Sequence, residues 1–364
     1  MIHPQLFAQS GNRKIRAGLI GTGTFGVSLM TQAPFISQLE IPVLCDQNID
    51  ALRQACRQVG IPEEDIAWCG SRAAILQAME KKKWVITQEA GLLMDLPLDV
   101  IVEATGHPEA GARNAEMAIA HGKHVAMVTK ETDSVIGAIL HHRAQQANLV
   151  YTPVDGDQHG LLMGLVAWAR NLGLEVVCGG KSHAHEFVCD ENRRTVSDGF
   201  SVVSLTEQEM TSFQPVAAND VAGVVQTRRE LLRRLSPIAV ADLCESVIAA
   251  NATGLRPDIP GLHGPVVRTT EIPEVLCPNK DGGVLREPGA IDVVACLRRA
   301  DEAGLAGGVF IVVACGDNAT WKFLNRKGIL VNQQGTHGLI YRPYHLLGIE
   351  TPVSILCAGL HNLS

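Results

Sequence analysis

One stretch of this sequence decides the fold: Ala17-Gly18-Leu19-Ile20-Gly21-Thr22-Gly23-Thr24-Phe25-Gly26. It continues an apolar strand that begins at Ile15, and its last three glycines have the spacing G-x-G-x-x-G. That spacing is typical of the turn between a strand and a helix that binds a dinucleotide. Gly21 allows the sharp turn, Gly23 lets the backbone approach a pyrophosphate, and Gly26 lets the helix pack close to the strand. The first N–H groups of the helix then favour the phosphates, so the stretch predicts a dinucleotide site.

The residues after the turn agree with this interpretation. A helix is expected over Val27–Leu39 and a strand over Ile41–Cys45, and Asp46 follows Gly26 by twenty positions. An acidic residue at that distance binds the ribose diol in dinucleotide-binding folds. The alternative is a glycine-rich turn in another α/β unit, followed by a chance acidic residue. The expected cofactor contacts in this region are Gly21, Thr22, Gly23, Thr24, Phe25, Gly26 and Asp46.

Strand and helix patterns alternate from Ile15 to about Val150. Helices are expected over 51–59, 71–80, 108–121 and 134–147, and strands over 98–106, 123–128 and 149–154. Alternating units of this length predict an α/β protein whose N-terminal Rossmann domain has a doubly wound parallel sheet.

The pattern changes after about Val154. Helices are expected over 161–172, 235–252 and 351–360, and strands over 174–178, 291–298 and 308–314. Residues 186–230 have weaker periodicity, and residues 256–288 are rich in proline and glycine, which indicates loops. We therefore expect an NAD(P)-binding domain over 1–154, an α+β domain for substrate binding and dimerisation over 155–335, and a C-terminal segment over 336–364 that returns toward the first domain.

Composition narrows the possible partners and the compartment. The chain has 364 residues, of which 46% are hydrophobic, and its formal net charge is -7. Because no long basic run accompanies this charge, neither nucleic acid nor an anionic membrane is an expected partner. No apolar run reaches the ~18 residues of a membrane span, and the first residues lack the pattern of a signal peptide. Ten cysteines are present without a CxxC pair, and Cys45, Cys296 and Cys315 lie in apolar runs. We therefore expect core thiols in a reducing cytoplasm.

Two segments follow strands at the edge where ligands bind in open α/β sheets. In the first, Ala104, Thr105 and Gly106 are small residues that would let the nicotinamide end of a cofactor pass. An ordinary turn between a strand and a helix is the alternative. In the second, Lys130 is placed to polarise a carbonyl group, to hold a substrate anion or to contact the cofactor. A surface lysine in a loop is the alternative for Lys130.

Asp155 and Asp157 follow the next expected strand, and in extended chain both carboxylates would face one side. Such a pair suits a hard divalent cation, Mn²⁺ or Mg²⁺, or a role in proton transfer. Equally, Asp157 would cap the helix that begins near His159.

Three further stretches carry polar side chains near expected strand ends. Lys181 follows Gly179-Gly180 and is a candidate for binding an anionic substrate group. His183 and His185 would share a face in extended chain, as metal ligands do, but no third ligand is evident at a fixed spacing. The stretch Thr336–His345 is polar, aromatic and basic, so it would either close an active site or link the chain back to the first domain.

These segments together resemble the homoserine-dehydrogenase-like oxidoreductases, including the deoxyxylulose-phosphate-reductoisomerase-like enzymes. The matching pieces are Gly21–Gly26, Val102–Gly106, Gly122–Val125, Asp155–Gln158, Val166–Arg170, Gly179–Lys181, Ala250–Leu255 and Tyr341–Leu346. Thr129-Lys130-Glu131 is similar to the NKE segment of the reductoisomerases, and Val154-Asp155-Gly156-Asp157 is similar to their metal-binding D-x-E segment.

The sequence departs from these families in three places. Members often carry a C-terminal SAF-type domain, and this chain stops before it. The Asn-Lys-rich loop of the reductoisomerases is not recognisable, although Gln214–Gln226 stands roughly at its place. The threonine-rich substrate motif of homoserine dehydrogenases is also missing. The resemblance therefore implies NAD(P)-dependent hydride transfer without defining the substrate.

We expect an NAD(P)-dependent oxidoreductase for a small polar carbonyl or hydroxyl substrate. Its candidate catalytic residues are Lys130, Asp155, Asp157 and Lys181. A deoxyxylulose 5-phosphate reductoisomerase-like reaction of isoprenoid biosynthesis is one possibility. A dehydrogenase of another sugar acid, polyol phosphate or amino-acid semialdehyde is a second, and a non-catalytic nucleotide sensor is a third. Because strands such as Gly308–Ala314 need cover, we also expect a homodimer or a higher homo-oligomer.

Overall fold

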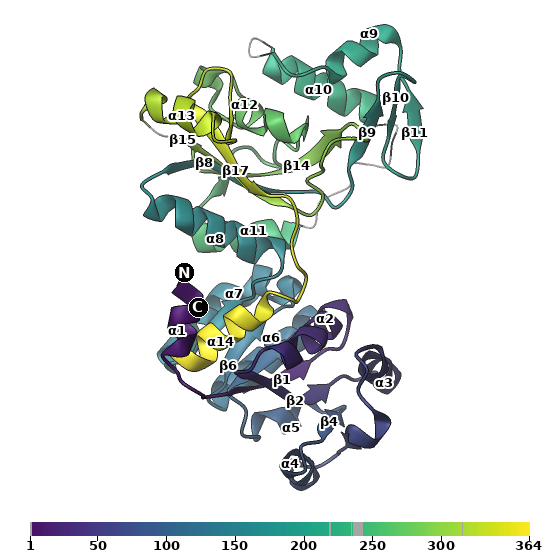
Figure 1. The fold of residues 1–364 in the computed structure, drawn as a ribbon, viewed down its shortest axis with the longest axis vertical. Coiled ribbons are helices and arrows are strands. Elements are labelled where there is room, and N and C mark those ends of the chain that lie inside the picture. The colour runs from purple at the N-terminus through teal and green to yellow at the C-terminus, as the bar shows by residue number, and fades with distance from the viewer. Residues whose placement is uncertain (1, 218–219, 234, 236–242, 315) are drawn as a thin grey trace. The chain divides into compact units, whose positions relative to one another are not determined.

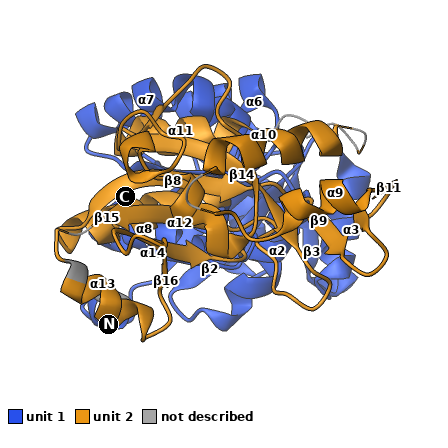
Figure 2. Ribbon diagram, turned by 90° about the horizontal axis from the view of Figure 1, so that it is seen from above, with its two compact units in different colours: residues 1–157, 346–364 blue, residues 158–345 orange. Residues whose placement is uncertain are grey.

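The computed structural model describes residues 2–217, 220–233, 235, 243–314 and 316–364. The chain forms two compact units (Figure 2), one of residues 1–157 with 346–364 and the other of residues 158–345. The boundaries expected from the sequence were 154/155 and 335/336, whereas compactness places them at 157/158 and 345/346. The first unit is therefore built from both ends of the chain.

The first unit contains a seven-stranded parallel sheet with the order β3-β4-β2-β1-β5-β6-β7. Its strands are β1 (Ile15–Ile20), β2 (Leu39–Cys45), β3 (Ile66–Trp68), β4 (Trp84–Thr87), β5 (Val100–Glu103), β6 (His124–Met127) and β7 (Tyr151–Pro153). The predicted Rossmann-type parallel sheet is confirmed. The short strands β3 and β4 were not predicted; with them counted, Lys130 follows the sixth strand of the chain and Asp155 follows the seventh.

Helices connect these strands (Figure 1): α2 (Thr24–Gln32), α3 (Ile49–Gln58), α4 (Arg72–Glu80), α5 (Ala90–Met94), α6 (Pro108–Ala120) and α7 (Lys130–Gln146). Side chains cap two of them, since Asn48 accepts hydrogen bonds from the N–H groups of Asp50 and Ala51, and Ser71 accepts one from Ala74. The helix α2 ends well before the predicted Leu39. Pro34 has no N–H group to continue the helical hydrogen bonds, and a short 3₁₀ turn over Ala33–Phe35 follows instead.

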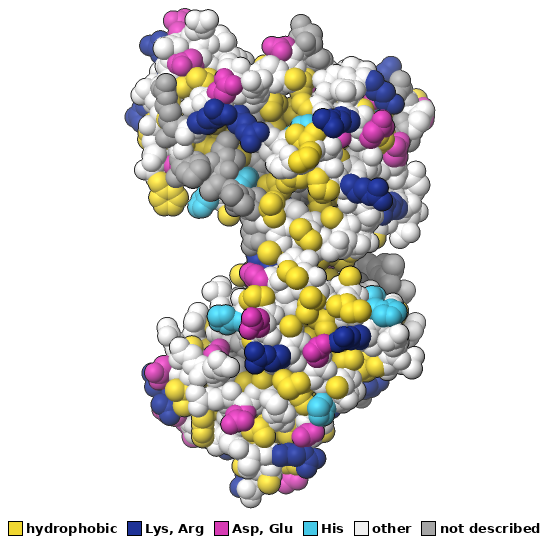
Figure 3. Space-filling view, turned by 180° about the vertical axis from the view of Figure 1, so that it is seen from behind, with side chains coloured by type: hydrophobic (Ala, Val, Ile, Leu, Met, Phe, Trp, Pro, Cys, Tyr) yellow, Lys and Arg dark blue, Asp and Glu magenta, His cyan; other side chains and the backbone are white. Residues whose placement is uncertain are grey.

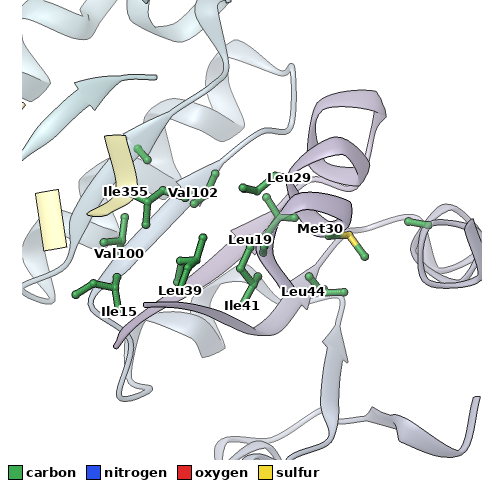
Figure 4. Packing of buried hydrophobic residues seen from close by; sticks show 14 of the residues in the cluster. Ile15, Leu19, Leu29, Met30, Leu39, Ile41, Leu44, Val100, Val102 and Ile355 are labelled. Atoms are coloured by element: carbon green, nitrogen blue, oxygen red, sulfur yellow. The ribbon is translucent and has the colours of Figure 1, made fainter. Parts of the chain in front are cut away.

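The C-terminal helix α14 (Thr351–His361) completes the core of the first unit. Figure 4 shows Ile355 of α14 beside Val100 and Val102 of β5, and all three side chains are fully buried. The helix α14 lies very close to β1, because a Cβ atom at Gly359 of α14 would be 2.8 Å from Cδ1 of Ile15. On its other side α14 contacts the N-terminal helix α1 (Ile2–Ala8), where the ring of Phe7 stacks on His361.

The second unit contains a ten-stranded mixed sheet whose main order is β11-β10-β9-β14-β8-β15-β17-β16. Its strands are β8 (Glu175–Ser182), β9 (Phe187–Asp190), β10 (Thr195–Ser197), β11 (Val202–Ser204), β12 (Arg256–Pro257), β13 (Val266–Val267), β14 (Ala290–Arg298), β15 (Val309–Ala314), β16 (Leu330–Val331) and β17 (His337–Arg342). The strand β8 runs parallel to β14 and antiparallel to β15. This sheet gives the chain its predicted α/β, two-domain architecture.

The helices of the second unit are α8 (Gln158–Asn171), α9 (Glu207–Met210), α10 (Val221–Leu232), α11 (Leu243–Thr253), α12 (Ile272–Val275) and α13 (Asn318–Asn325). The predicted helix 235–252 extends over residues 236–242, which lie outside the described part of the chain. The helices α8 and α11 pack on each other, and α8 packs on β8 and β15.

Two expectations about the second unit are corrected by this sheet. Residues Val309–Val313 of β15 are fully buried between β8 and β17, so they do not need a second copy as cover. A homodimer therefore remains a prediction based on the family resemblance alone. The stretch Thr336–His345 contains β17, a strand of the second unit, and the chain returns to the first unit only after His345.

Other sequence expectations concern the surface and the thiols. None of the described helices is long and apolar enough to cross a membrane. On the face drawn in Figure 3, acidic and basic side chains are interspersed rather than gathered by sign.

Cys45 and Cys296 are buried, and burial raises the pKa of the Cys45 thiol to about 12 and that of the Cys296 thiol to about 11. Cys315 lies outside the described residues.

Candidate functional site

The glycine turn follows β1 and has the geometry of a nucleotide cradle. Gly21 has a φ of 98°, and a Cβ atom there would clash with the carbonyl oxygen of Ala104. A Cβ atom at Gly26 would in turn clash with the carbonyl oxygen of Gly21. At Gly23, by contrast, nothing lies within 4 Å of the Cβ position. Gly21 and Gly26 therefore serve packing, and Gly23 opens the backbone N–H groups at the start of α2 to a ligand.

Asp46 lies directly after β2, next to the glycine turn. Its Oδ2 atom accepts hydrogen bonds from the N–H group and the hydroxyl group of Thr22, both at 2.8 Å. Its Oδ1 atom accepts one from the N–H group of Asn48 at 2.9 Å. The side chain is only partly buried, so the carboxylate is oriented by the protein and still has acceptor capacity for a ribose diol. These residues fit the adenosine half of a nicotinamide dinucleotide.

The loop Ala104–Gly106 lies after β5, the neighbour of β1 in the sheet. The N–H group of Gly106 donates to the hydroxyl of Thr129 at 3.0 Å, which joins this loop to the end of β6. The sequence analysis did not assign a role to Glu103, whose carboxyl group contacts Thr105 and Asn114. An acidic residue that ends an otherwise apolar strand, Val-Ile-Val-Glu, is the signal that could have identified it.

Lys130 is the first residue of α7 and is partly exposed. Its strand β6 lies between β5 and β7. Because all seven strands are parallel, Asp46, the glycine turn, Ala104–Gly106 and Lys130 follow one another along the carboxyl edge of the sheet. The sequence predicted this edge, and the topology brings these candidates to it.

Asp155 and Asp157 lie at the same edge, but not in the extended conformation that the sequence analysis assumed. Gly156 between them has a φ of 100° and forms a turn, so alternation along a strand does not place the two carboxylates on one side. Asp155 is engaged with α14: its Oδ2 atom accepts a hydrogen bond from the hydroxyl of Ser354 at 2.9 Å, and its N–H group donates to that hydroxyl oxygen at 2.8 Å. Asp157 is 7% exposed.

A divalent cation at this pair was one of the predictions from the sequence. Among the described residues there is no group of three or more His, Cys, Asp or Glu side chains disposed to hold a metal ion. Hard cations take six or more oxygen ligands, and one carboxylate of the expected pair already bonds to Ser354. A metal at this edge would need most of its ligands from water or substrate.

Lys181 belongs to the second unit and lies inside β8, which is longer than the predicted strand 174–178. It shares a face of β8 with Gly179, where a Cβ atom would lie 2.6 Å from Cδ1 of Leu255. Its ammonium group forms a buried ion pair with the carboxylate of Glu245 on α11, and the two side chains are 6% and 5% exposed. Lys181 is therefore charge-compensated inside the protein, rather than presented as a free cation for an anionic substrate.

Glu245 was not predicted as a functional residue. It is the only acidic residue of α11, in the run Leu-Cys-Glu-Ser-Val-Ile-Ala-Ala-Asn-Ala-Thr, and an acid in such an apolar helix is the signal that could have identified it. The hydroxyl of the adjacent Ser246 is buried and has no hydrogen-bond partner among the described residues. The Lys181–Glu245 ion pair thus joins β8 to α11.

His183 and His185 follow β8. The backbone N–H group of His183 donates to the carbonyl of Val294, and His185 makes an edge-on contact with the ring of Phe200. Burial, and then the positive charge of Lys181, lowers the pKa of His183. The expected metal pair thus lacks a third His, Cys, Asp or Glu ligand among the described residues.

Comparison with known proteins gives one family match and several structural ones. Residues 240–351 match the family described as Oxidoreductase DRL, catalytic domain, and this stretch includes Glu245 and Asp292. No curated protein sequence matches the chain. The match covers less than half of the chain, and it supports classing the protein as an oxidoreductase.

Three solved structures illustrate the structural matches. A homoserine dehydrogenase from Thiobacillus denitrificans is 23% identical, with 45% of this chain and 35% of that chain covered and a TM-score of 0.34. An oxidoreductase from Agrobacterium radiobacter, in complex with NAD+, L-tartaric acid and magnesium, is 18% identical, with 47% and 44% covered and a TM-score of 0.35. A probable dehydrogenase from Thermotoga maritima is 13% identical, with 94% and 85% covered and a TM-score of 0.41. The matched stretch spans less than half of the first two proteins.

Proposed function

We propose that this protein is an NAD(P)-dependent oxidoreductase that acts on a small polar substrate with a carbonyl or hydroxyl group. The observation that carries this proposal is that the three glycines have different surroundings. A Cβ atom at Gly21 or Gly26 would clash with backbone atoms, whereas the space at the Cβ position of Gly23 is open. The oriented carboxylate of Asp46 adds a partner for the ribose. The match of residues 240–351 to an oxidoreductase catalytic domain supports the same conclusion independently.

The nicotinamide, when bound, supplies the hydride chemistry. The protein's own residues bind the cofactor and polarise the substrate. Gly21–Gly26, Asp46, Ala104–Gly106 and Lys130 would hold the cofactor along the carboxyl edge of the first sheet. In the second unit, the Lys181 ammonium can donate a proton to a substrate oxygen, and the Glu245 carboxylate can take one from Lys181 or from substrate. Both side chains are almost fully buried, at 6% and 5% exposed.

The second unit bears on the class of substrate. A lysine that is already paired with a carboxylate adds no net charge to its surroundings, so it favours a neutral carbonyl or hydroxyl group over a phosphate. This supports a dehydrogenase of a sugar acid or an amino-acid semialdehyde, whereas a polyol phosphate would need a phosphate-binding group elsewhere. A deoxyxylulose 5-phosphate reductoisomerase-like reaction remains the second candidate, supported by the resemblance of Thr129-Lys130-Glu131 to the NKE segment of those enzymes. It would need a phosphate-binding group other than Lys181.

Substitution at Gly23 tests the proposal without disturbing the fold. Gly23→Val fills the open space where a pyrophosphate would lie, and it meets no protein atom within 4 Å of its Cβ position. We expect it to weaken NADH binding by about tenfold or more, measured by the fluorescence of bound NADH. Gly70→Val is the matched control, because its Cβ position is equally open and lies outside the turn.

Two results would contradict the proposal. If the parent protein binds neither NADH nor NADPH, the first unit is not a nicotinamide site. If Gly23→Val and Gly70→Val both bind NADH as the parent does, the glycine turn does not hold the cofactor. A substrate screen with both nicotinamides then separates an enzyme from a non-catalytic nucleotide sensor, since a sensor binds the cofactor without turnover.

A further inference from the structure

Glu103 ends β5 with a carboxyl group that solvent does not reach, since its exposed fraction is 0%. Its backbone carbonyl accepts a hydrogen bond from Val128 at 2.8 Å, so the residue also joins β5 to the chain after β6. Burial of a carboxyl group is unfavourable unless hydrogen bonds compensate it. The groups that these hydrogen bonds hold in place therefore indicate why an acidic residue occupies this position.

One carboxyl oxygen of Glu103 accepts several hydrogen bonds. Its Oε1 atom accepts from the hydroxyl of Thr105 at 2.6 Å, from the N–H group of Thr105 at 3.3 Å and from the side-chain amide of Asn114 at 3.3 Å. Thr105 lies in the loop Ala104–Gly106, and Asn114 lies on α6. A single atom thus ties the loop to the helix that follows it.

The loop held in this way forms a wall of the glycine turn. The N–H group of Ala104 donates to the carbonyl of Ile20 at 2.7 Å, and a side chain at Gly21 would clash with the Ala104 carbonyl. Gly106, which follows Thr105, has a φ of 69°, and its N–H group donates a hydrogen bond to the hydroxyl of Thr129. A shift of Thr105 would therefore move the backbone that lines the proposed dinucleotide site.

The second carboxyl oxygen of Glu103 faces α6 and α7. Its Oε2 atom is buried without a hydrogen-bond partner among the described residues, and it lies 3.0 Å from the Cβ position of Gly111. Burial raises the pKa of Glu103, and the hydrogen bonds from Thr105, Thr129 and Asn114 oppose that shift. An apolar residue would avoid these costs, so the acceptor at Oε1 is the feature that an acid or an amide provides here.

We propose that Glu103 is a positioning residue for the nicotinamide cofactor: its Oε1 atom fixes Thr105 so that the loop Ala104–Gly106 keeps the conformation that the cofactor contacts. This inference rests on the proposed function of the first unit. Glu103 would thus affect cofactor affinity without touching the cofactor, because its side chain is not exposed to solvent in this structure.

Three variants test this inference. Glu103→Ala removes the acceptor, and we expect the dissociation constant for NADH to rise by about tenfold. Glu103→Gln keeps a carbonyl oxygen at the Oε1 position, and we expect it to bind NADH within about twofold of the parent. Thr105→Val removes the hydroxyl donor alone and should give an intermediate rise, so the inference stays testable if Glu103→Ala does not fold.

Asp133→Ala is the matched control. Asp133 is another buried carboxyl group of the first unit, and its Oδ1 atom accepts a hydrogen bond from the hydroxyl of Tyr151 at 2.7 Å rather than from the loop. We expect this variant to lower the melting temperature and to leave NADH affinity unchanged. If Glu103 had a purely structural role, Glu103→Ala would behave like Asp133→Ala: it would lower the melting temperature and leave NADH affinity unchanged.

The outcomes separate this inference from the proposed function. Parent-like NADH affinity in Glu103→Ala, or in Thr105→Val where Glu103→Ala does not fold, would overturn the positioning role while the cofactor site stands. Equal losses in Glu103→Gln and Glu103→Ala would also overturn it, because the retained oxygen would then be irrelevant. A parent protein that binds no nicotinamide would overturn both.

Discussion

The Asp46 carboxylate accepts two hydrogen bonds from one residue, Thr22, through its N–H group and through its hydroxyl group, each at 2.8 Å. The acid expected to bind a ribose is thereby fixed to the glycine turn that is expected to bind the pyrophosphate. The negative charge stays where a 2′-phosphate of NADP would lie, and Gln47 and Asn48, rather than an arginine, follow it in the sequence.

The first prediction therefore concerns the choice of cofactor. We expect NAD to bind at least as tightly as NADP, because Asp46 bonds a ribose diol and repels a 2′-phosphate. Asp46→Asn removes the repulsion and should shift the ratio of the two affinities toward NADP. Titration of both cofactors measures this ratio, and Thr22→Val serves as a control that retains the Asp46 charge. Tenfold tighter binding of NADP to the parent would contradict the prediction.

The second prediction concerns the buried pair of Lys181 and Glu245. Removing one partner leaves an uncompensated buried charge, which typically costs about 3–5 kcal/mol of stability. We expect Lys181→Met and Glu245→Leu each to lower the free energy of unfolding, and the double variant to recover most of it. Turnover should be lost in all three. Urea denaturation beside steady-state kinetics tests this, and normal turnover in the stable double variant would remove the pair from the mechanism.

The third prediction separates Lys130 and Asp157 from Asp155. Losing a group that stabilises a developing oxyanion typically costs about 10²–10³ in turnover. We expect losses of this size in Lys130→Ala, which removes an ammonium group, and in Asp157→Asn, whose carboxylate can stabilise an oxyanion only by holding a divalent cation. Cofactor affinity should change little in Asp157→Asn, because the glycine turn, Asp46 and Lys130 are untouched. Asp155→Asn should instead lower the melting temperature, because Asp155 bonds Ser354 of α14.

Single-turnover kinetics and cofactor titration, with and without Mn²⁺ or a chelator, test this third prediction. Near-normal turnover in both Lys130→Ala and Asp157→Asn would remove these residues from the mechanism. Insensitivity to the chelator would remove only the divalent cation, and Lys130 would remain as the polarising group.

The fourth prediction concerns the pH dependence of stability. Burial raises the pKa of Glu103, so the folded state favours the protonated form. Stability is then greatest below the unfolded pKa of about 4.3 and falls as the pH rises toward the folded pKa. Glu103→Gln has no proton to lose at this position. We expect its free energy of unfolding, relative to the parent, to increase as the pH rises from 4 toward 8.

Urea denaturation at several pH values measures this difference. Glu109→Gln is a suitable control, because it changes an exposed carboxyl group on the same helix, α6, that contacts Glu103. A difference between Glu103→Gln and the parent that stays constant with pH would show that Glu103 does not change its protonation on unfolding in this range.

Much of the first unit could be predicted, because its signals are local. Short-range rules determine the apolar runs of β1, β2 and β5 and the turn at Gly21. They also favour glycine at Gly122, which follows α6 and has a left-handed φ of 71°. The strands β3 and β4 have only three and four residues, and their pairing depends on neighbours far along the chain.

The partners of side chains were harder to predict than the elements. Lys181 and Glu245 are separated by 64 positions, and only the packing of α11 against β8 shows that they form a pair. The expected alternation of Asp155 and Asp157 failed at Gly156, whose left-handed conformation turns the chain. Sequence spacing predicts a local face, whereas these contacts depend on tertiary structure.

The position of α14 has a consequence for how this protein is made. The helix packs on β1, β5 and β6 and buries Ile355 against strands that were synthesised more than about two hundred residues earlier. The proposed nucleotide-binding unit comes first in the chain. On the ribosome, the part of its sheet that α14 covers must wait while all of residues 158–345 emerge, although α2 and α3 already contribute to the same core cluster. The second unit is continuous and can fold first. The order of folding during translation is therefore expected to be the reverse of the order of the sequence.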